Sequence, residues 1–175
     1  MKRLLLLRHA KSARPAGVAD HERPLAARGR DDARSMGRYL AEETFLPDLA
    51  LVSTSTRTRE TIGILAQELR ETPVTRFEHR LYDASASRML AVIAETAPEI
   101  DTLLVIGHNP GMAELAQFLA GHGDRYAFAR MRVKFPTCGL AVLDLPGNDW
   151  QAPASGSARL DRFVSPKSLG ADIDD

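Results

Sequence analysis

The chain has 175 residues, of which 44% are hydrophobic and 26% charged, and these values are ordinary for one soluble domain with a good-sized core. Its 23 basic and 23 acidic residues cancel to a formal net charge of zero, so no global basic field exists to recruit nucleic acid or an acidic membrane. A single cysteine, Cys138, excludes an intrachain disulfide and a cysteine metal cluster.

The N-terminal apolar run, residues 4–7, consists of leucines only. This run is shorter than the core of a secretory signal and far too short to span a membrane. Because nothing in the sequence demands an oxidising compartment, we expect a cytoplasmic protein without a membrane partner.

Strand and helix patterns alternate along the chain, which predicts a layered α/β domain. The first half is expected to hold a strand over residues 3–7, a loop over 11–24, a helix over about 25–43, a strand over 49–52, a helix with an apolar stripe from Ile62 to Leu69, and a short strand over 74–77. The second half is expected to hold a helix from Met89 to Ala97, a strand over 102–106, a helix over 112–119, a basic loop or excursion over 121–136, and strands over 140–145 and 160–164. We expect residues 1–170 to form a single domain and residues 171–175 an acidic tail.

Three of the predicted strands end at residues suited to chemistry on an anion. Arg8 and His9 follow the first strand, Arg57 lies just beyond the second, and His108 follows the strand over 102–106. If these strands are parallel, their carboxyl ends open at one edge of the sheet, where ligands bind in α/β folds. We therefore expect the two arginines and two histidines to converge on one pocket.

These residue types suit phosphoryl transfer. A neutral imidazole such as that of His9 can attack phosphorus and form a covalent phosphohistidine, which water then hydrolyses. Arg8 and Arg57 can neutralise charge on the phosphoryl oxygens through bidentate hydrogen bonds. A protonated His108 can donate a further bond, and it precedes a helix whose N-terminal amides favour anions. This chemistry requires no metal and no cofactor.

Four segments, taken in order, form a known pattern. They are Arg8-His9-Ala10, then Arg23-Pro24-Leu25 with Arg28-Gly29, then residues 53–61 around Arg57, and the turn Gly107-His108-Asn109-Pro110-Gly111. Together they resemble the histidine phosphatase superfamily, also called the phosphoglycerate mutase-like fold, and within it the small phosphohistidine phosphatase branch typified by SixA. The chain departs from that pattern at Ala10, Thr54 and Glu60, where glycine, proline and glutamine are the usual residues.

The resemblance implies a three-layer α/β/α fold with a mostly parallel central sheet. It also implies that His9 is the nucleophile, that Arg8 and Arg57 bind phosphate, that His108 completes the pocket, and that Arg23 is a further phosphate ligand. The alternative for Arg23 is a solvated loop residue paired with a nearby carboxylate. The other histidines lack a comparable setting and are interpreted as surface or loop residues: His21, His79 and His122.

The leaving-group side of the reaction is less defined. Larger members of the superfamily use a glutamate or aspartate to protonate the leaving group, and their glutamate motif is not recognisable here. Asp83 and Glu78 are candidates by position, and Asp83 also suits a turn or cap. A phosphoramidate has a labile P–N bond and needs less acid help than a sugar phosphate, which favours phosphohistidine as the substrate.

The leading hypothesis is a cofactor-independent phosphatase that works through a phosphohistidine on His9, with phosphohistidine in a protein as its substrate. The same fold also allows a small-molecule phosphomonoesterase or mutase, so the partner is a phosphorylated protein or a small phosphorylated substrate. A non-catalytic phosphoryl-binding module would not need a nucleophile. A metal hydrolase would need a ligand spacing such as HExxH, which the sequence lacks. The physiological substrate and the oligomeric state stay open.

Overall fold

A computed structural model of the chain describes residues 1–170, so the acidic tail predicted at 171–175 lies outside the described residues. Strands and helices alternate in the order β1 (Lys2–Arg8), α1 (Ala27–Glu42), β2 (Leu49–Val52), α2 (Thr56–Gln67), β3 (Val74–Phe77), α3 (Ala86–Ala94), β4 (Thr102–Gly107), α4 (Gly111–Leu119), β5 (Ala120–Gly123), α5 (Arg125–Val133), β6 (Leu140–Leu145), β7 (Ala158–Val164) and α6 (Pro166–Gly170). Two short 3₁₀ helices lie at Asp20–Glu22 and His79–Leu81.

The strands of residues 1–170 form one seven-stranded sheet in the order β3-β2-β4-β1-β6-β7-β5. β6 is antiparallel to both of its neighbours, and the other strand pairs are parallel. The register pairs Arg8 with Gly107 and Val52 with Ile106, which brings the carboxyl ends of β1, β4 and β2 level with one another. The expected mostly parallel sheet is confirmed.

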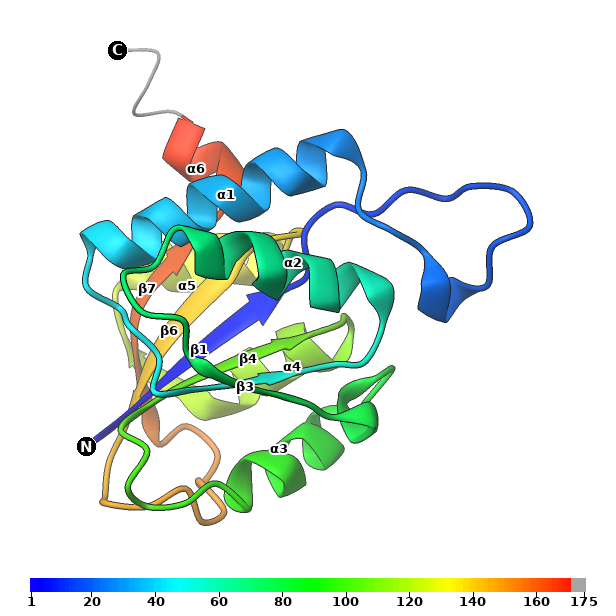
Figure 1. Cartoon of the computed structure of the whole chain (residues 1–175). Coiled ribbons are helices and arrows are strands. Elements are labelled where there is room, and N and C mark those ends of the chain that lie inside the picture. The colour runs from blue at the N-terminus through cyan, green and yellow to red at the C-terminus, as the bar shows by residue number, and fades with distance from the viewer. Residues whose placement is uncertain (171–175) are drawn as a thin grey trace.

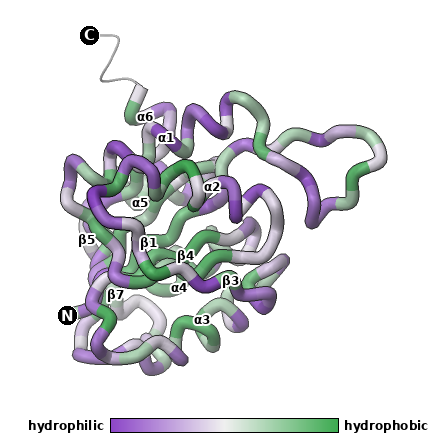
Figure 2. The backbone as a smooth tube through the Cα atoms, in the orientation of Figure 1, coloured by the Kyte–Doolittle hydropathy of each residue, from purple (hydrophilic) through white to green (hydrophobic). Residues whose placement is uncertain are grey.

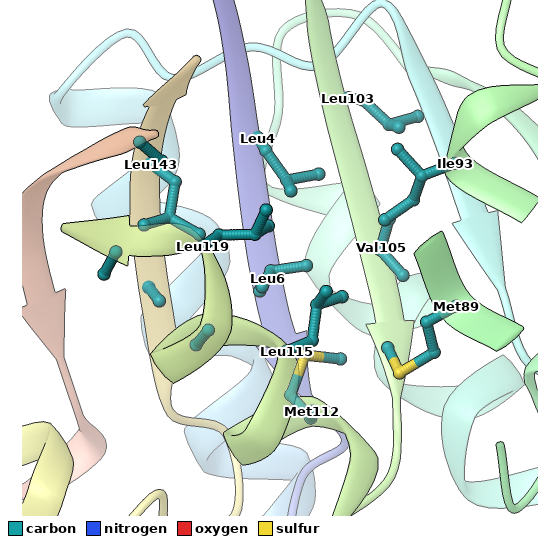
Figure 3. Close-up of a cluster of buried hydrophobic side chains, with 14 of the residues drawn as sticks. Leu4, Leu6, Met89, Ile93, Leu103, Val105, Met112, Leu115, Leu119 and Leu143 are labelled. Atoms are coloured by element: carbon teal, nitrogen blue, oxygen red, sulfur yellow. The ribbon is translucent and has the colours of Figure 1, made fainter. Parts of the chain in front are cut away.

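Side chains of β1 alternate between two buried clusters, one on each face of the sheet. Leu4 and Leu6 belong to the cluster covered by α3, α4 and α5, which Figure 3 shows in part. Leu5 and Leu7 belong to the cluster covered by α1 and α2. Each fully buried leucine stabilises the fold by about 1.5–3 kcal/mol. Helices on both faces make the three layers visible in Figure 1, and Figure 2 shows the apolar residues concentrated in the central strands.

The segment over 121–136 is not the predicted loop, because it contains β5 and α5. Gly121 of β5 lies so close to the segment before β7 that a Cβ there would be 1.9 Å from the Gly156 carbonyl oxygen, so β5 lacks the side-chain pattern that marks most strands. Asp124 caps α5, which buries only Ala127 and Met131 and exposes a basic surface. Such a narrow apolar stripe gives little helical signal in a sequence.

The helix α3 lies three residues closer to the N-terminus than its sequence pattern predicts, because it begins at Ala86 rather than Met89. It ends at Ala94 rather than Ala97, because Thr96 N–H turns back to the carbonyl of Ile93 in a tight final turn. None of the helices in residues 1–170 has the length and apolar character needed to cross a membrane.

Candidate active site

A pocket of about 250 Å³ opens at the carboxyl ends of β1, β2 and β4. The arrowheads of β1 and β4 point to this edge, and the loop over residues 9–26 projects from it (Figure 1). Twelve residues line the pocket, and they include every site residue predicted from the sequence except Glu78: Arg8, His9, Lys11, Ser12, Arg14, Asp20, Arg23, Arg57, Asp83, His108, Asn109 and Thr137. The expected convergence of the strand ends is therefore present.

His9 is buried beyond the end of β1, with 6% of its surface exposed. Its Nδ1 lies 2.7 Å from the carbonyl oxygen of Ala10. A carbonyl only accepts hydrogen bonds, so Nδ1 carries the proton and Nε2 carries the lone pair. The imidazole is thus fixed in the tautomer in which Nε2 is the nucleophilic atom.

His108 lies beside it, with the two ring centroids 5.3 Å apart. Its Nε2 is 2.8 Å from the Ser53 hydroxyl oxygen, and Arg57 Nη2 is 3.4 Å from its Nδ1. Because a guanidinium only donates, Nδ1 is the acceptor and Nε2–H donates to Ser53. Both ring nitrogens of His108 therefore have protein partners.

Both histidines are neutral at physiological pH. Burial lowers the pKa of His9 to about 4, although its bond to the Ala10 carbonyl opposes the shift and nearby arginine charges add to it. Burial also lowers the pKa of His108 to about 3, with further contributions from the charges of His9 and Arg57. A neutral His9 is the form that can attack phosphorus.

The arginines crowd positive charge around the two rings. Arg8 donates from Nη1 to the Phe135 carbonyl (3.1 Å), and burial together with the Arg57 charge lowers its pKa. Arg57 is 6% exposed and donates from Nη1 to the backbone carbonyl of Asp20 (2.7 Å). The Nε–H groups of both arginines are buried without a partner within residues 1–170. Like charges held together in a partly dry pocket favour a bound anion between them.

Sequence reasoning missed the central position of Asp20. Its carboxylate accepts from Arg23 Nη1 (2.8 Å), from Arg57 Nη2 (3.1 Å) and from the Tyr82 hydroxyl. These bonds, that of Tyr82 first, lower the pKa of Asp20 far below its usual value, so it stays ionised. Arg23 therefore lines the pocket and also pairs with a loop carboxylate, which combines both interpretations of the sequence.

Tyr82 was also missed, and it stands edge-on to His108 with ring centroids 5.4 Å apart. Nothing in the local sequence distinguishes it, because its partner Asp20 lies 62 positions away. Next to it is His21, whose Nε2 lies 2.9 Å from the Thr54 hydroxyl that replaces the usual proline. His21 is thus a loop residue next to the site that does not line the pocket, whereas His122 is exposed in β5.

The two acid candidates are in different places. Asp83 lines the pocket and has a positive φ of 54°, as suits the turn that was its alternative interpretation. Glu78 is bound to Arg80, with Oε1 2.9 Å from Nε, and does not line the pocket. Cys138 is fully buried, and burial raises the pKa of its thiol, so it is the inert small hydrophobe that was expected.

Hydrogen bonds from neighbouring elements hold the site in place. Thr61 of α2 accepts from the Ala10 N–H (3.1 Å) and donates to the Arg57 carbonyl in the same helix (2.7 Å), which ties α2 to the segment after β1. Glu60, at the usual glutamine position, accepts from the Leu25 N–H (2.8 Å). Gly111 is required after β4, because a Cβ there would lie 2.1 Å from the Ala84 carbonyl oxygen.

Residues 1–170 contain no group of three or more His, Cys, Asp or Glu side chains placed to hold a metal ion.

Comparisons with known proteins identify the family of the chain. The family model of the histidine phosphatase superfamily (branch 1) matches residues 4–84. The uncharacterized protein Rv1276c of Mycobacterium tuberculosis is 40% identical over 163 residues, which cover 92% of this chain and 100% of that protein.

Two solved structures are similar over nearly their whole length. The proposed phosphohistidine phosphatase SixA of Agrobacterium tumefaciens is 30% identical, with a TM-score of 0.80 over 94% of this chain and 98% of that one. A protein of the same description from Nakamurella multipartitia is 28% identical, with a TM-score of 0.81 over 94% of this chain and 96% of that one. The chain therefore belongs to the histidine phosphatase superfamily, in its SixA-type branch with the phosphoglycerate mutase-like fold, and is a phosphatase-like hydrolase.

Proposed function

We propose that this chain is a cofactor-independent phosphatase that carries the phosphoryl group on Nε2 of His9 and acts on phosphohistidine in a protein. The observation that carries the proposal is the hydrogen bond of His9 Nδ1–H to the Ala10 carbonyl. It leaves the Nε2 lone pair available in a pocket where Arg8 and Arg57 supply positive charge. A module that only bound phosphoryl groups would not need this tautomer.

The reaction has two balanced steps. In the first, Nε2 of His9 attacks phosphorus, the bond from phosphorus to the substrate nitrogen breaks, and the substrate imidazole leaves as a neutral ring after taking a proton from solvent. In the second, water attacks phosphorus and the bond to Nε2 breaks. Inorganic phosphate leaves, and His9 returns to its neutral state. Splitting one displacement into two is the advantage of a covalent intermediate.

The surrounding cations act on the phosphoryl oxygens in both steps. Arg8 and Arg57 neutralise charge that is spread over these oxygens in the transition state. A phosphoryl dianion beside His108 favours the protonated form of that ring, since an opposite charge within a few ångströms raises a histidine pKa. His108 then changes from an acceptor of the Arg57 bond to a donor toward the phosphoryl group.

The substrate class follows from the carboxyl groups of the pocket. Asp20 is held ionised by Tyr82 and the arginines and is a poor proton donor. Asp83 is the remaining carboxyl that lines the pocket, and we assign it as the candidate acid. An alcohol phosphate would depend on this single acid, whereas a substrate with a labile P–N bond would not. Phosphohistidine has such a bond.

A comparison of substrates tests the proposal. We expect kcat/KM on a phosphohistidine peptide to exceed that on a sugar phosphate, because the P–N bond is the more labile one. Asp83→Asn should lower kcat/KM for the sugar phosphate by about 100-fold, the size of a general-acid contribution, and leave the phosphohistidine peptide unaffected. A wild-type preference for the sugar phosphate would show instead a small-molecule phosphomonoesterase.

A further inference from the structure

A second hollow, which we name the basic groove, opens beside the catalytic pocket. It has a volume of about 750 Å³ and shares Arg8, Lys11 and Thr137 with that pocket. The rest of its lining is Arg28, Arg130, Val133, Lys134, Pro136, Phe163, Ser165, Pro166 and Lys167. A ligand in the catalytic pocket can therefore extend directly into the groove.

The groove concentrates positive charge in a chain whose formal net charge is zero. Six of its lining residues are basic and none is acidic. They come from separate elements, with Arg28 on α1, Arg130 on α5 and Lys167 on α6. Such a local field attracts anions even though the whole protein is neutral.

Much of this charge is not used to stabilise the fold. Within residues 1–170, Lys11, Lys134 and Lys167 are exposed and form no ion pair, whereas Arg28 is 3.6 Å from Asp32 and Arg130 donates to the Phe163 carbonyl. Single exposed lysines on a protein surface are common, but here three of them line the same groove. The arrangement is that of a binding surface.

Apolar side chains lie between these cations. Val133, at the end of α5, is 87% exposed, the largest exposed fraction among the large hydrophobic side chains of residues 1–170. Pro136, Phe163 and Pro166 line the same hollow. An apolar centre with a charged rim is the usual anatomy of a protein–protein interface. A small phosphate ester would need the cations but not the apolar centre.

The carboxylates of the site lie outside the basic groove. Asp20 and Asp83 line the catalytic pocket but not the groove, and Asp20 is paired with Arg23 and Arg57. An acidic partner therefore meets only basic, polar and apolar side chains in the groove. Charge complementarity thus favours docking of an acidic segment there.

We propose that the basic groove binds an acidic, amphipathic segment of the phosphoprotein substrate, next to the phosphohistidine that enters the catalytic pocket. The carboxylates of that segment pair with Lys134, Lys167 and their neighbours, and its apolar side chains cover Val133. This inference rests on the proposed function and narrows its substrate class to phosphohistidine in an acidic sequence context.

Three phosphorylated probes and two variants test this inference. The probes are free phosphoramidate, a phosphohistidine peptide with Asp, Glu and Leu around the phosphohistidine, and a matched peptide with Asn and Gln in place of the carboxylates. The variant Lys134→Glu/Lys167→Glu reverses charge in the groove. Its control, Arg70→Glu/Arg76→Glu, makes the same change of charge at exposed residues around β3, at the opposite edge of the sheet.

At low ionic strength we expect wild type to prefer the acidic peptide, and the groove variant to lower kcat/KM for that peptide by about tenfold. Phosphoramidate hydrolysis should stay unchanged in both variants, and the control variant should behave as wild type on every probe. Equal wild-type rates on the two peptides would overturn the groove assignment. An equal loss on phosphoramidate and acidic peptide would also overturn it, because it would show a general field effect on catalysis. No wild-type hydrolysis of either peptide would instead contradict the proposed function.

Discussion

The ends of β1 and β4 carry the two central histidines, and they differ in how hydrogen bonds hold each ring. His9 and His108 are equally buried, follow neighbouring parallel strands and are both neutral. His9 uses only Nδ1, in its bond to the Ala10 carbonyl, whereas His108 has partners at both ring nitrogens. Position at a strand end therefore does not assign the nucleophile. The hydrogen bonds to each ring assign it, because they leave only the His9 ring with an available lone pair.

The largest effect should come from removing the nucleophile. His9→Ala is expected to lower kcat on a phosphohistidine peptide by about 10⁴-fold or more, as for other enzymes that lose the attacking group. Steady-state phosphate release measures it, with circular dichroism as the control for folding. Activity within tenfold of wild type would exclude attack by His9.

Removing the imidazole ring of His108 should lower kcat less than removing that of His9. His108→Ala deletes a donor to the phosphoryl oxygens but leaves the nucleophile, so kcat should fall by about 100- to 1,000-fold, the usual cost of losing one such donor. Single-turnover kinetics should still show phosphoryl transfer to the enzyme. If this variant lost activity as fully as His9→Ala and formed no phosphoenzyme, the roles of the two rings would be reversed.

Acid should destabilise the fold through both rings. The pKa of His9 is about 4 and that of His108 about 3 when folded, against about 6.5 for an unfolded histidine. Between these values the unfolded chain binds more protons, so the free energy of unfolding falls as pH drops below about 6.5. The loss by pH 4.5 should be on the order of 2 kcal/mol or more, at about 1.4 kcal/mol per pKa unit.

Urea unfolding at pH 7, 6, 5 and 4.5 measures this loss. The control is His9→Gln/His108→Gln, which removes both titrating rings and should lose much less stability over the same range. An equal loss in wild type and variant would place the acid sensitivity elsewhere in the protein.

The smallest expected effect on kcat comes from removing a hydrogen bond that orients the His108 ring. Ser53→Ala removes the acceptor of its Nε2–H bond and should lower kcat by roughly three- to tenfold, equivalent to about 0.5–1.5 kcal/mol for one hydrogen bond. The matched control is Ser85→Ala, which removes the N-cap of α3. It should lower the melting temperature and leave kcat unchanged. Equal kcat in the two variants would show that Ser53 has no part in positioning His108.

The convergence of the site could be predicted because it depends on local patterns. The leucine run before Arg8 and the apolar run before His108 mark buried strands, and parallel strands end at a common edge. The layers of the fold follow from the same alternation of strand and helix. Here the sequence pattern and the tertiary structure agree.

Other parts of the site depend on contacts that no local pattern encodes. Asp20 meets Arg57 and Tyr82 only because the loop over 9–26 folds back across the strand ends. The His9 tautomer is set by a bond of 2.7 Å, which spacing along the sequence does not reveal. The helix α5 was missed because it buries so little, and that same exposure creates the basic groove.

The most direct test of the central claim is to find the atom that carries the phosphoryl group. The enzyme, with ¹⁵N-labelled histidines, is mixed with excess phosphoramidate, and the phosphoenzyme is trapped by alkaline quenching and analysed by ³¹P–¹⁵N NMR and peptide mapping. The account predicts one phosphorylated residue, His9, with phosphorus bonded to Nε2. Phosphorus on Nδ1 of His9 or on His108, or turnover with no phosphoenzyme at all, would contradict it.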